Sequence, residues 1–192
     1  MTVPNVGHVT ALADYPECAA GIVRRFLSTL APGDVSCAQR TPEIHVVPEF
    51  PLSVSGAPAA EPAGAADRST PADRRGAWAA AWATGDALAR WWLMYGSEGH
   101  GLRGGRFTAS GDYLAYSPVS LDMRRVRFVG DVAVSGVVEW DRRRGAIRAR
   151  LRLSGASTGK LRIGWSTRAT RAVASLRGTL GGRRVRLRTP AP

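Results

Sequence analysis

Three histidines and two cysteines are the side chains best suited to catalysis or metal binding in this chain: His8, His45, His100, Cys18 and Cys37. Histidine can act as a general base toward a serine, and both residue types are common zinc ligands. The five show none of the usual ligand spacings, so the sequence predicts no metal site and no cofactor. A lone histidine in a glycine-containing loop, as at His8, is by itself usually structural.

A serine motif occurs much later, in Gly155-Ala-Ser157-Thr-Gly159. The G-x-S-x-G pattern is typical of a nucleophile elbow, in which a strained turn between a strand and a helix exposes the serine. Here the following residues, 160–165, alternate as in a strand, and the motif comes after His8, which reverses the order of that fold. The same turn matches S-x-x-K without the helix and is one residue short of a phosphate-binding loop. We therefore predict a hairpin turn.

The two cysteines flank a predicted helix. Residues 14–17 are typical of a helix start, apolar residues then recur at helical spacing, and Pro32 ends the pattern. The helix from Cys18 to Leu30 would span about 18 Å, and the seven steps to Cys37 reach at most about 23 Å. The chain can therefore return beside the helix and form a disulfide worth roughly 3 kcal/mol, which is typical of an oxidising compartment.

A second helix follows a segment that resembles a linker. Prolines interrupt residues 41–52, and Ala, Pro, Gly and Ser dominate as far as residue 72. Thr70-Pro71-Ala-Asp73 is typical of a helix start, and the helix is expected to run to about Tyr95. Apolar residues at helical spacing predict a core face rather than an aromatic ligand platform; they are Trp78, Ala81, Trp82, Leu88, Ala89, Trp92 and Tyr95.

From Leu102 onward apolar and polar residues alternate, which is the period of a strand. Turns such as Gly130-Asp131 and Gly181-Gly182 separate the segments. Arginines take every second position in 147–153 and 184–188, which indicates one buried and one solvated face. We predict an α+β fold, in which the tryptophan helix packs on an antiparallel meander of about seven or eight strands.

The charge of the chain is concentrated in this second half. The formal net charge is +12, and residues 101–192 contain 20 basic and 5 acidic side chains. Such a surface can attract nucleic acid or acidic partners. Ala, Gly and Arg dominate together, however, as in a GC-rich coding sequence, so a solvated basic face is the simpler interpretation and nucleic acid is not an expected partner. No apolar run reaches the roughly 18 residues of a membrane span, and no signal peptide follows Met1.

The surroundings of His8 match a known pattern. Val3-Pro-Asn-Val-Gly-His8 precedes Asp14-Tyr-Pro-Glu-Cys18 at a helix start, and Ser36-Cys37-Ala38 follows. This string resembles the end of the hydrolase domain in α/β-hydrolases of the tripeptidyl-aminopeptidase-like group. The later sequence resembles the appended C-terminal region of some members, in the tryptophan helix and in residues 101–105, 126–128, 134–142 and 178–182.

The resemblance implies three parts. Residues 1–40 would be the end of a hydrolase domain, residues 41–72 a linker, and residues 73–192 a C-terminal domain of helix and sheet. His8 would be the triad histidine, a general base toward serine and then a general acid toward the leaving group. Cys18 and Cys37 match the paired cysteines of the family. The intact relative would cleave peptide or ester bonds through an acyl-enzyme, outside the cell or at its surface.

No residue matches the family's nucleophile, triad acid or oxyanion hole, all of which precede the histidine in that family. The chain is therefore expected to be a C-terminal fragment of a serine hydrolase that is inactive alone and whose partner is the missing hydrolase portion. The resemblance implies that the first helix would lack the sheet that it covers in the family, so residues 1–37 are expected to be loosely held, to dock on the β domain or to self-associate.

Two other interpretations remain open. The tryptophan helix and the basic sheet could form a stand-alone binding module for a polyanion, a cell-surface polymer or a partner protein. The chain could also be a non-functional remnant.

Overall fold

The computed structural model describes residues 18–40, 50–94, 96–111, 118–169 and 171–192, so His8 and His45 lie outside the described residues. The chain divides into two compact units, Met1–Glu49 and Phe50–Pro192, and each is described by itself. Within the described residues, no helix combines the length and the hydropathy that crossing a bilayer requires.

In the first unit a helix and a short 3-10 turn share a small core. Helix α2 spans Cys18–Thr29 and η1 spans Ser36–Arg40. Cys18, Ile22 and Ala38 are buried against one another. The rest of the apolar stripe on α2 points to solvent in this unit, since Phe26 is 48% exposed and Leu27 is 75% exposed.

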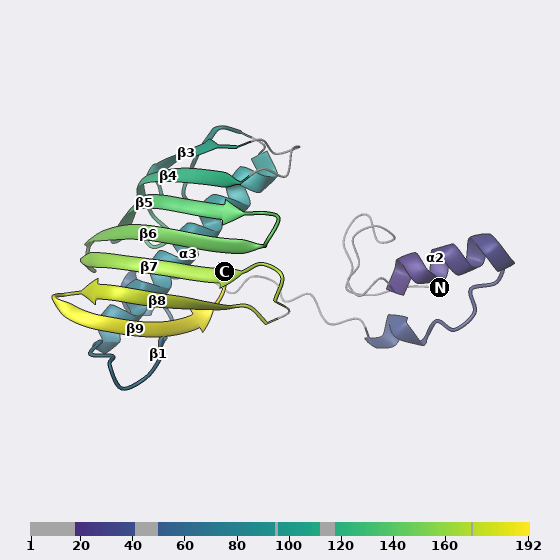
Figure 1. Ribbon diagram of the computed structural model, residues 1–192, viewed down its shortest axis with the longest axis horizontal. Helices are drawn as coiled ribbons and strands as arrows, with labels where there is room; N and C mark the ends of the chain where they lie inside the picture. The colour runs from purple at the N-terminus through teal and green to yellow at the C-terminus, as the bar shows by residue number, and fades with distance from the viewer. Residues whose placement is uncertain (1–17, 41–49, 95, 112–117, 170) are drawn as a thin grey trace. The chain divides into compact units, whose positions relative to one another are not determined.

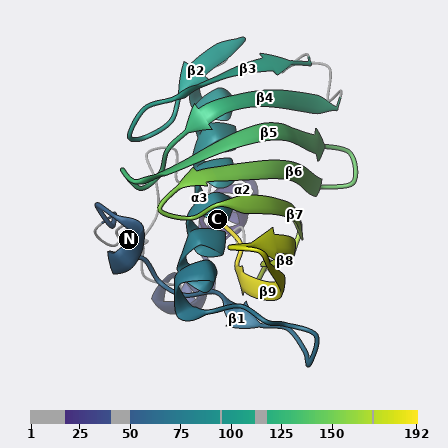
Figure 2. The ribbon, with the colours of Figure 1, turned by 90° about the vertical axis from the view of Figure 1, so that its left-hand side faces the viewer.

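The second unit is a nine-stranded antiparallel sheet with one long helix, α3, on one face (Figures 1 and 2). Eight strands form a meander, in which each strand pairs with the next along the chain, and β1 adds to the far edge beside β9. The strands are β1 Glu61–Pro62, β2 Glu98–His100, β3 Arg106–Ser110, β4 Val119–Val126, β5 Val132–Asp141, β6 Ala146–Gly155, β7 Gly159–Ser166, β8 Val173–Leu180 and β9 Arg183–Pro190.

The α+β fold and the meander are confirmed by this sheet, and two short edge strands differ from the prediction. β2 lies before Leu102, where the predicted strands begin, and pairs His100 with Arg106. β1 lies in the predicted linker and pairs Glu61 with Arg188. Strands of two or three residues carry too little alternation to be recognised from periodicity.

The described part of the predicted linker, residues 50–72, is a folded segment of the second unit. Its turn η2, Val54–Gly56, is held by a hydrogen bond of 2.8 Å from the Val54 amide to the Asp131 carboxylate. Beyond β1, the amides of Ala63 and Arg68 donate to carbonyls of β9. The segment therefore covers an edge strand whose backbone groups would otherwise be unpaired. The linker prediction is wrong here because composition does not show these tertiary hydrogen bonds.

Helix α3 spans Pro71–Met94 and begins with the predicted capping arrangement. The Thr70 amide donates to the Asp73 carboxylate at 2.8 Å, and the Asp73 amide donates to the Thr70 hydroxyl at 3.2 Å. These two bonds satisfy amides that the first helical turn leaves without a partner in the helix.

The buried side of α3 is wider than the predicted stripe and is centred elsewhere. Trp78 and Leu88 are buried as expected, but Ala89 is exposed and Trp92 is 37% exposed, whereas Trp91 is buried. The first half of α3 is buried almost all round, because the sheet covers one side and the segment carrying η2 and Ala60 packs with it in the same core. A helix enclosed on two sides has no single apolar stripe.

Candidate functional site

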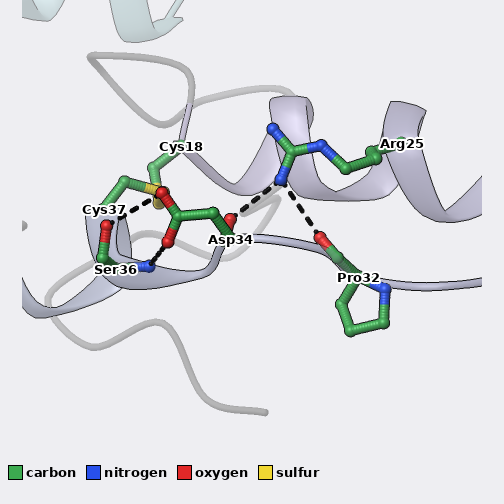
Figure 3. The surroundings of a disulfide bond; sticks show 6 residues. All are labelled: Cys18, Arg25, Pro32, Asp34, Ser36 and Cys37. Carbon is green, nitrogen blue, oxygen red and sulfur yellow. Dashed lines mark hydrogen bonds between the residues drawn. A yellow bond between two sulfur atoms is a disulfide. The ribbon is translucent and has the colours of Figure 1, made fainter.

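The predicted catalytic residue, His8, lies outside the described residues, so the structure places only the elements that follow it. Cys18 and Cys37 form a disulfide with their Cα atoms 5.8 Å apart, as predicted (Figure 3). The segment that follows α2 is held to the helix by Arg25, whose guanidinium donates hydrogen bonds to the carbonyls of Pro32 at 3.2 Å and Asp34 at 2.9 Å. Asp34 in turn accepts a hydrogen bond of 2.8 Å from the Ser36 amide.

The serine motif is the hairpin turn between β6 and β7, as predicted. Ser157 is only 7% exposed. Its hydroxymethyl group lies against Gly76 on α3, where an added Cβ would collide with it. A buried serine beneath a helix cannot attack a substrate, and the turn joins two antiparallel strands rather than a strand and a helix. The described residues also contain no cluster of three or more His, Cys, Asp or Glu side chains that could hold a metal ion.

The solvated face of the sheet carries a line of four arginines in register, which we call the arginine row. Strand pairing sets Arg150 opposite Arg162, Arg162 opposite Arg177, and Arg177 opposite Arg186. All four side chains are exposed. Like charges directly opposite each other destabilise a sheet, so this alignment works against folding stability rather than for it.

A second row runs parallel to the arginine row, two residues along each strand. It pairs Ser135 with Arg152, Arg152 with Lys160, Lys160 with Thr179, and Thr179 with Arg184. The second row therefore adds three positive charges and two hydroxyl groups to the same face.

Between the two rows lies a trough, and its floor is formed by the backbone of the strands. The residues of the intervening line, Gly136, Leu151, Leu161, Gly178 and Val185, send their side chains to the helix face or have none. Both rows line one hollow of about 940 Å³ above this floor. The hollow contains no aromatic or acidic lining residue.

The two glycines of the floor are required by close strand approach. Gly136 has a φ of +140° and Gly178 has a φ of +158°. A Cβ built on either residue would lie 2.0 Å from a carbonyl oxygen, that of Arg150 beside Gly136 and that of Lys160 beside Gly178. The absence of a side chain at Gly136 and Gly178 therefore allows β5 to approach β6, and β8 to approach β7, at the centre of the trough.

Few negative charges among the described residues balance these rows. Glu139 lies 3.5 Å from the Arg150 guanidinium, and Glu61 lies 3.0 Å from that of Arg188, which is outside both rows. Asp67 fixes the outer end of the arginine row by accepting a hydrogen bond of 2.8 Å from the Arg186 amide. Burial raises the pKa of Asp67, but hydrogen bonds from Ser69 and Arg186 outweigh it and hold that pKa below its usual value.

A second hollow, of about 240 Å³, lies near the C-terminal end of α3 and is lined in part by Trp92, Trp140 and Trp165. Beside it the buried Arg142 guanidinium stacks over the indoles, with its central carbon 5.2 Å from the Trp92 ring centre and 5.9 Å from that of Trp140. This hollow is smaller than most ligand pockets. We interpret the cluster as packing that anchors the end of α3 on β5.

No protein-family model, curated protein or solved structure matches this chain. The candidate site therefore rests on the geometry of the two rows and the trough. The sequence showed alternating arginines on individual strands, but not which of them face each other across strands. That alignment depends on the lengths of the turns, which set the register of every pair.

Proposed function

We propose that this chain is the C-terminal part of a serine hydrolase of the tripeptidyl-aminopeptidase-like group and that His8 is the histidine of its triad. The observation that supports the proposal is the disulfide Cys18–Cys37, which joins a helix to the turn after it as the resemblance implies. The apolar stripe on α2, with Phe26 and Leu27 exposed in this unit, fits a helix whose partner is the hydrolase domain. The intact enzyme would cleave peptide or ester bonds through an acyl-enzyme.

Sequencing the DNA upstream tests the proposal first. We expect the upstream DNA to encode, in the same reading frame as this chain, a Gly-x-Ser-x-Gly elbow and a later aspartate. We call the product of the upstream segment and this chain together the joined protein. The joined protein should then hydrolyse a chromogenic ester, and His8→Ala should reduce kcat/KM by about 10³-fold or more, as removal of a triad member does. The matched control is His100→Ala on the exposed edge strand β2, which should retain activity.

Two outcomes would refute the hydrolase proposal. One is an upstream frame without the elbow. The other is full activity of the joined protein after His8→Ala. The 192-residue chain alone is expected to be inactive, so turnover by it that is blocked by a serine-directed phosphonate would contradict that expectation.

We propose a second function for the sheet domain, the binding of polyanions. It is supported by the in-register arginine row, a destabilising alignment that an anionic ligand would neutralise. Arg is suited to this role because its planar guanidinium binds carboxylate or phosphate in a bidentate manner. The full chain should be retained on an immobilised polyanion and eluted by salt.

The test compares two double variants that remove the same charge. Arg162→Gln with Arg177→Gln removes the centre of the arginine row, whereas Arg143→Gln with Arg144→Gln alters the β5–β6 turn. The first variant should elute at clearly lower salt than the second. Equal elution of the two variants would mean that net charge, rather than this face, accounts for retention.

A further inference from the structure

The geometry of the trough points to a linear acidic polysaccharide of the polyuronate type, bound across the strands with its carboxylates between the two rows. This inference rests on the proposed binding of polyanions and specifies the ligand. It concerns only the unit Phe50–Pro192, so it is independent of the hydrolase proposal.

The shape of the trough favours an extended chain. Its floor crosses five strands, from Gly136 on β5 to Val185 on β9. With strands about 4.8 Å apart, four steps span about 19 Å. The rows on either side are two residues apart along each strand, or about 7 Å. A ligand that uses the whole site is therefore long, narrow and perpendicular to the strands.

The placement of charge favours acidic groups on both sides of that chain. Arg150, Arg162, Arg177 and Arg186 form one side, and Arg152, Lys160 and Arg184 form the other. In an extended 1,4-linked polyuronate, successive carboxylates point to alternate sides, and each sugar ring advances the chain by nearly one strand spacing. Each carboxylate would then meet a guanidinium or ammonium group on the neighbouring strand. The hydroxyls of Ser135 and Thr179, both lining residues, offer hydrogen bonds to sugar hydroxyl groups.

Other polyanions fit less well. Proteins that bind single-stranded nucleic acid stack its bases on aromatic side chains, and the lining of this trough has none. Duplex DNA is usually bound by a helix or ribbon that enters a groove, whereas this surface is the face of a sheet.

The decisive experiment measures binding of the full chain to oligogalacturonates of increasing length by calorimetry at fixed salt. Affinity should rise with each added sugar up to about five units, the number of strands that the trough crosses, and then level off. The fully methyl-esterified oligomer, which has the same shape without the charge, should not bind. The Arg162→Gln, Arg177→Gln variant should bind at least about tenfold more weakly, and the Arg143→Gln, Arg144→Gln variant should bind as the parent does.

Two further probes, polyphosphate and single-stranded DNA, separate this inference from the broader proposal. Binding of either one as tightly as polygalacturonate, at equal charge concentration and with the same loss in the row variant, would overturn the polyuronate assignment but keep polyanion binding. Affinity that rises steadily with oligomer length would likewise overturn it, because a plain charged surface has no defined length. Absence of binding to every polyanion would overturn both.

Discussion

The Asp73 carboxylate in the first turn of α3 binds the Arg183 guanidinium at the start of β9, with 2.9 Å between Oδ2 and Nε. The two residues are 110 positions apart in the chain. Asp73 is 5% exposed and also accepts hydrogen bonds from the amide and hydroxyl of Thr70. One side chain thus caps the helix and ties it to the last strand of the meander.

Replacing Asp73 with Asn should lower the free energy of unfolding by about 2–3 kcal/mol at pH 7, since it removes the buried carboxylate of a charge-assisted pair with the half-exposed Arg183 and weakens the cap. Chemical denaturation measures this loss. The control is Asp122→Asn, which removes an exposed ion pair with Arg124 at 3.3 Å and should change the free energy of unfolding by less than about 0.5 kcal/mol. Equal effects of the two substitutions would contradict the structural role of Asp73.

The Asp73 carboxylate also makes the stability of the fold depend on pH in the acidic range. Burial raises the pKa of Asp73, but the hydrogen bonds and charge of Arg183 and the bonds from Thr70 outweigh it, so the folded-state pKa is lowered. A lowered pKa contributes stability above the unfolded-state value of about 3.9, and this is lost as pH falls through the folded-state pKa. The difference in stability between the parent and Asp73→Asn should therefore shrink in that acidic range. A difference that does not depend on pH would contradict the assignment.

In the arginine row, replacing a charged residue with a neutral one is expected to raise the free energy of unfolding, whereas Asp73→Asn lowers it. Arg162 faces Arg150 on one side and Arg177 on the other, so Arg162→Gln should raise the free energy of unfolding by a few tenths of a kcal/mol in about 0.01 M salt. In about 1 M salt, where the Debye length is only about 3 Å, the gain should vanish. Urea unfolding at the two salt concentrations measures it, with Arg143→Gln in the turn as control. A loss of stability in low salt would contradict the repulsion.

Local sequence predicted the elements of this fold better than it predicted their partners. The cap at Thr70 and Asp73 and the alternation in β6 and β9 depend on residues within a few positions of one another, and they are confirmed. The partners of residues 50–70 lie on α3, β9 and the β4–β5 turn, far away in sequence. The arginine row likewise exists only once the turns have fixed the register of four strands.

The trough floor predicts a contrast between two glycines with positive φ. Gly136→Ala places a Cβ 2.0 Å from the Arg150 carbonyl oxygen, whereas at Gly104, with φ +100°, an added Cβ has no atom within 4 Å. Backbone strain alone should make Gly104→Ala cost about 1–2 kcal/mol, while the added collision should make Gly136→Ala cost more than about 3 kcal/mol. Thermal unfolding of the two variants measures the contrast. Similar losses of stability in the two variants would mean that β5 and β6 can move apart at Gly136 without an energetic cost.

Removing the disulfide is expected to destabilise only the unit that contains it. Cys18 and Cys37 are 19 residues apart, and closing a loop of that size stabilises the folded state by about 3 kcal/mol. Among the described residues of that unit the buried core is small, consisting of Cys18, Ile22 and Ala38, while the sheet unit has a separate and much larger core. Cys18→Ser with Cys37→Ser should therefore speed amide hydrogen exchange in residues 18–40 and leave β4 to β9 as slow as before. The control is Gly21→Ala, which has no atom within 4 Å of its added Cβ and should slow exchange in α2. Faster exchange across the sheet in the double serine variant would show that the two units unfold together.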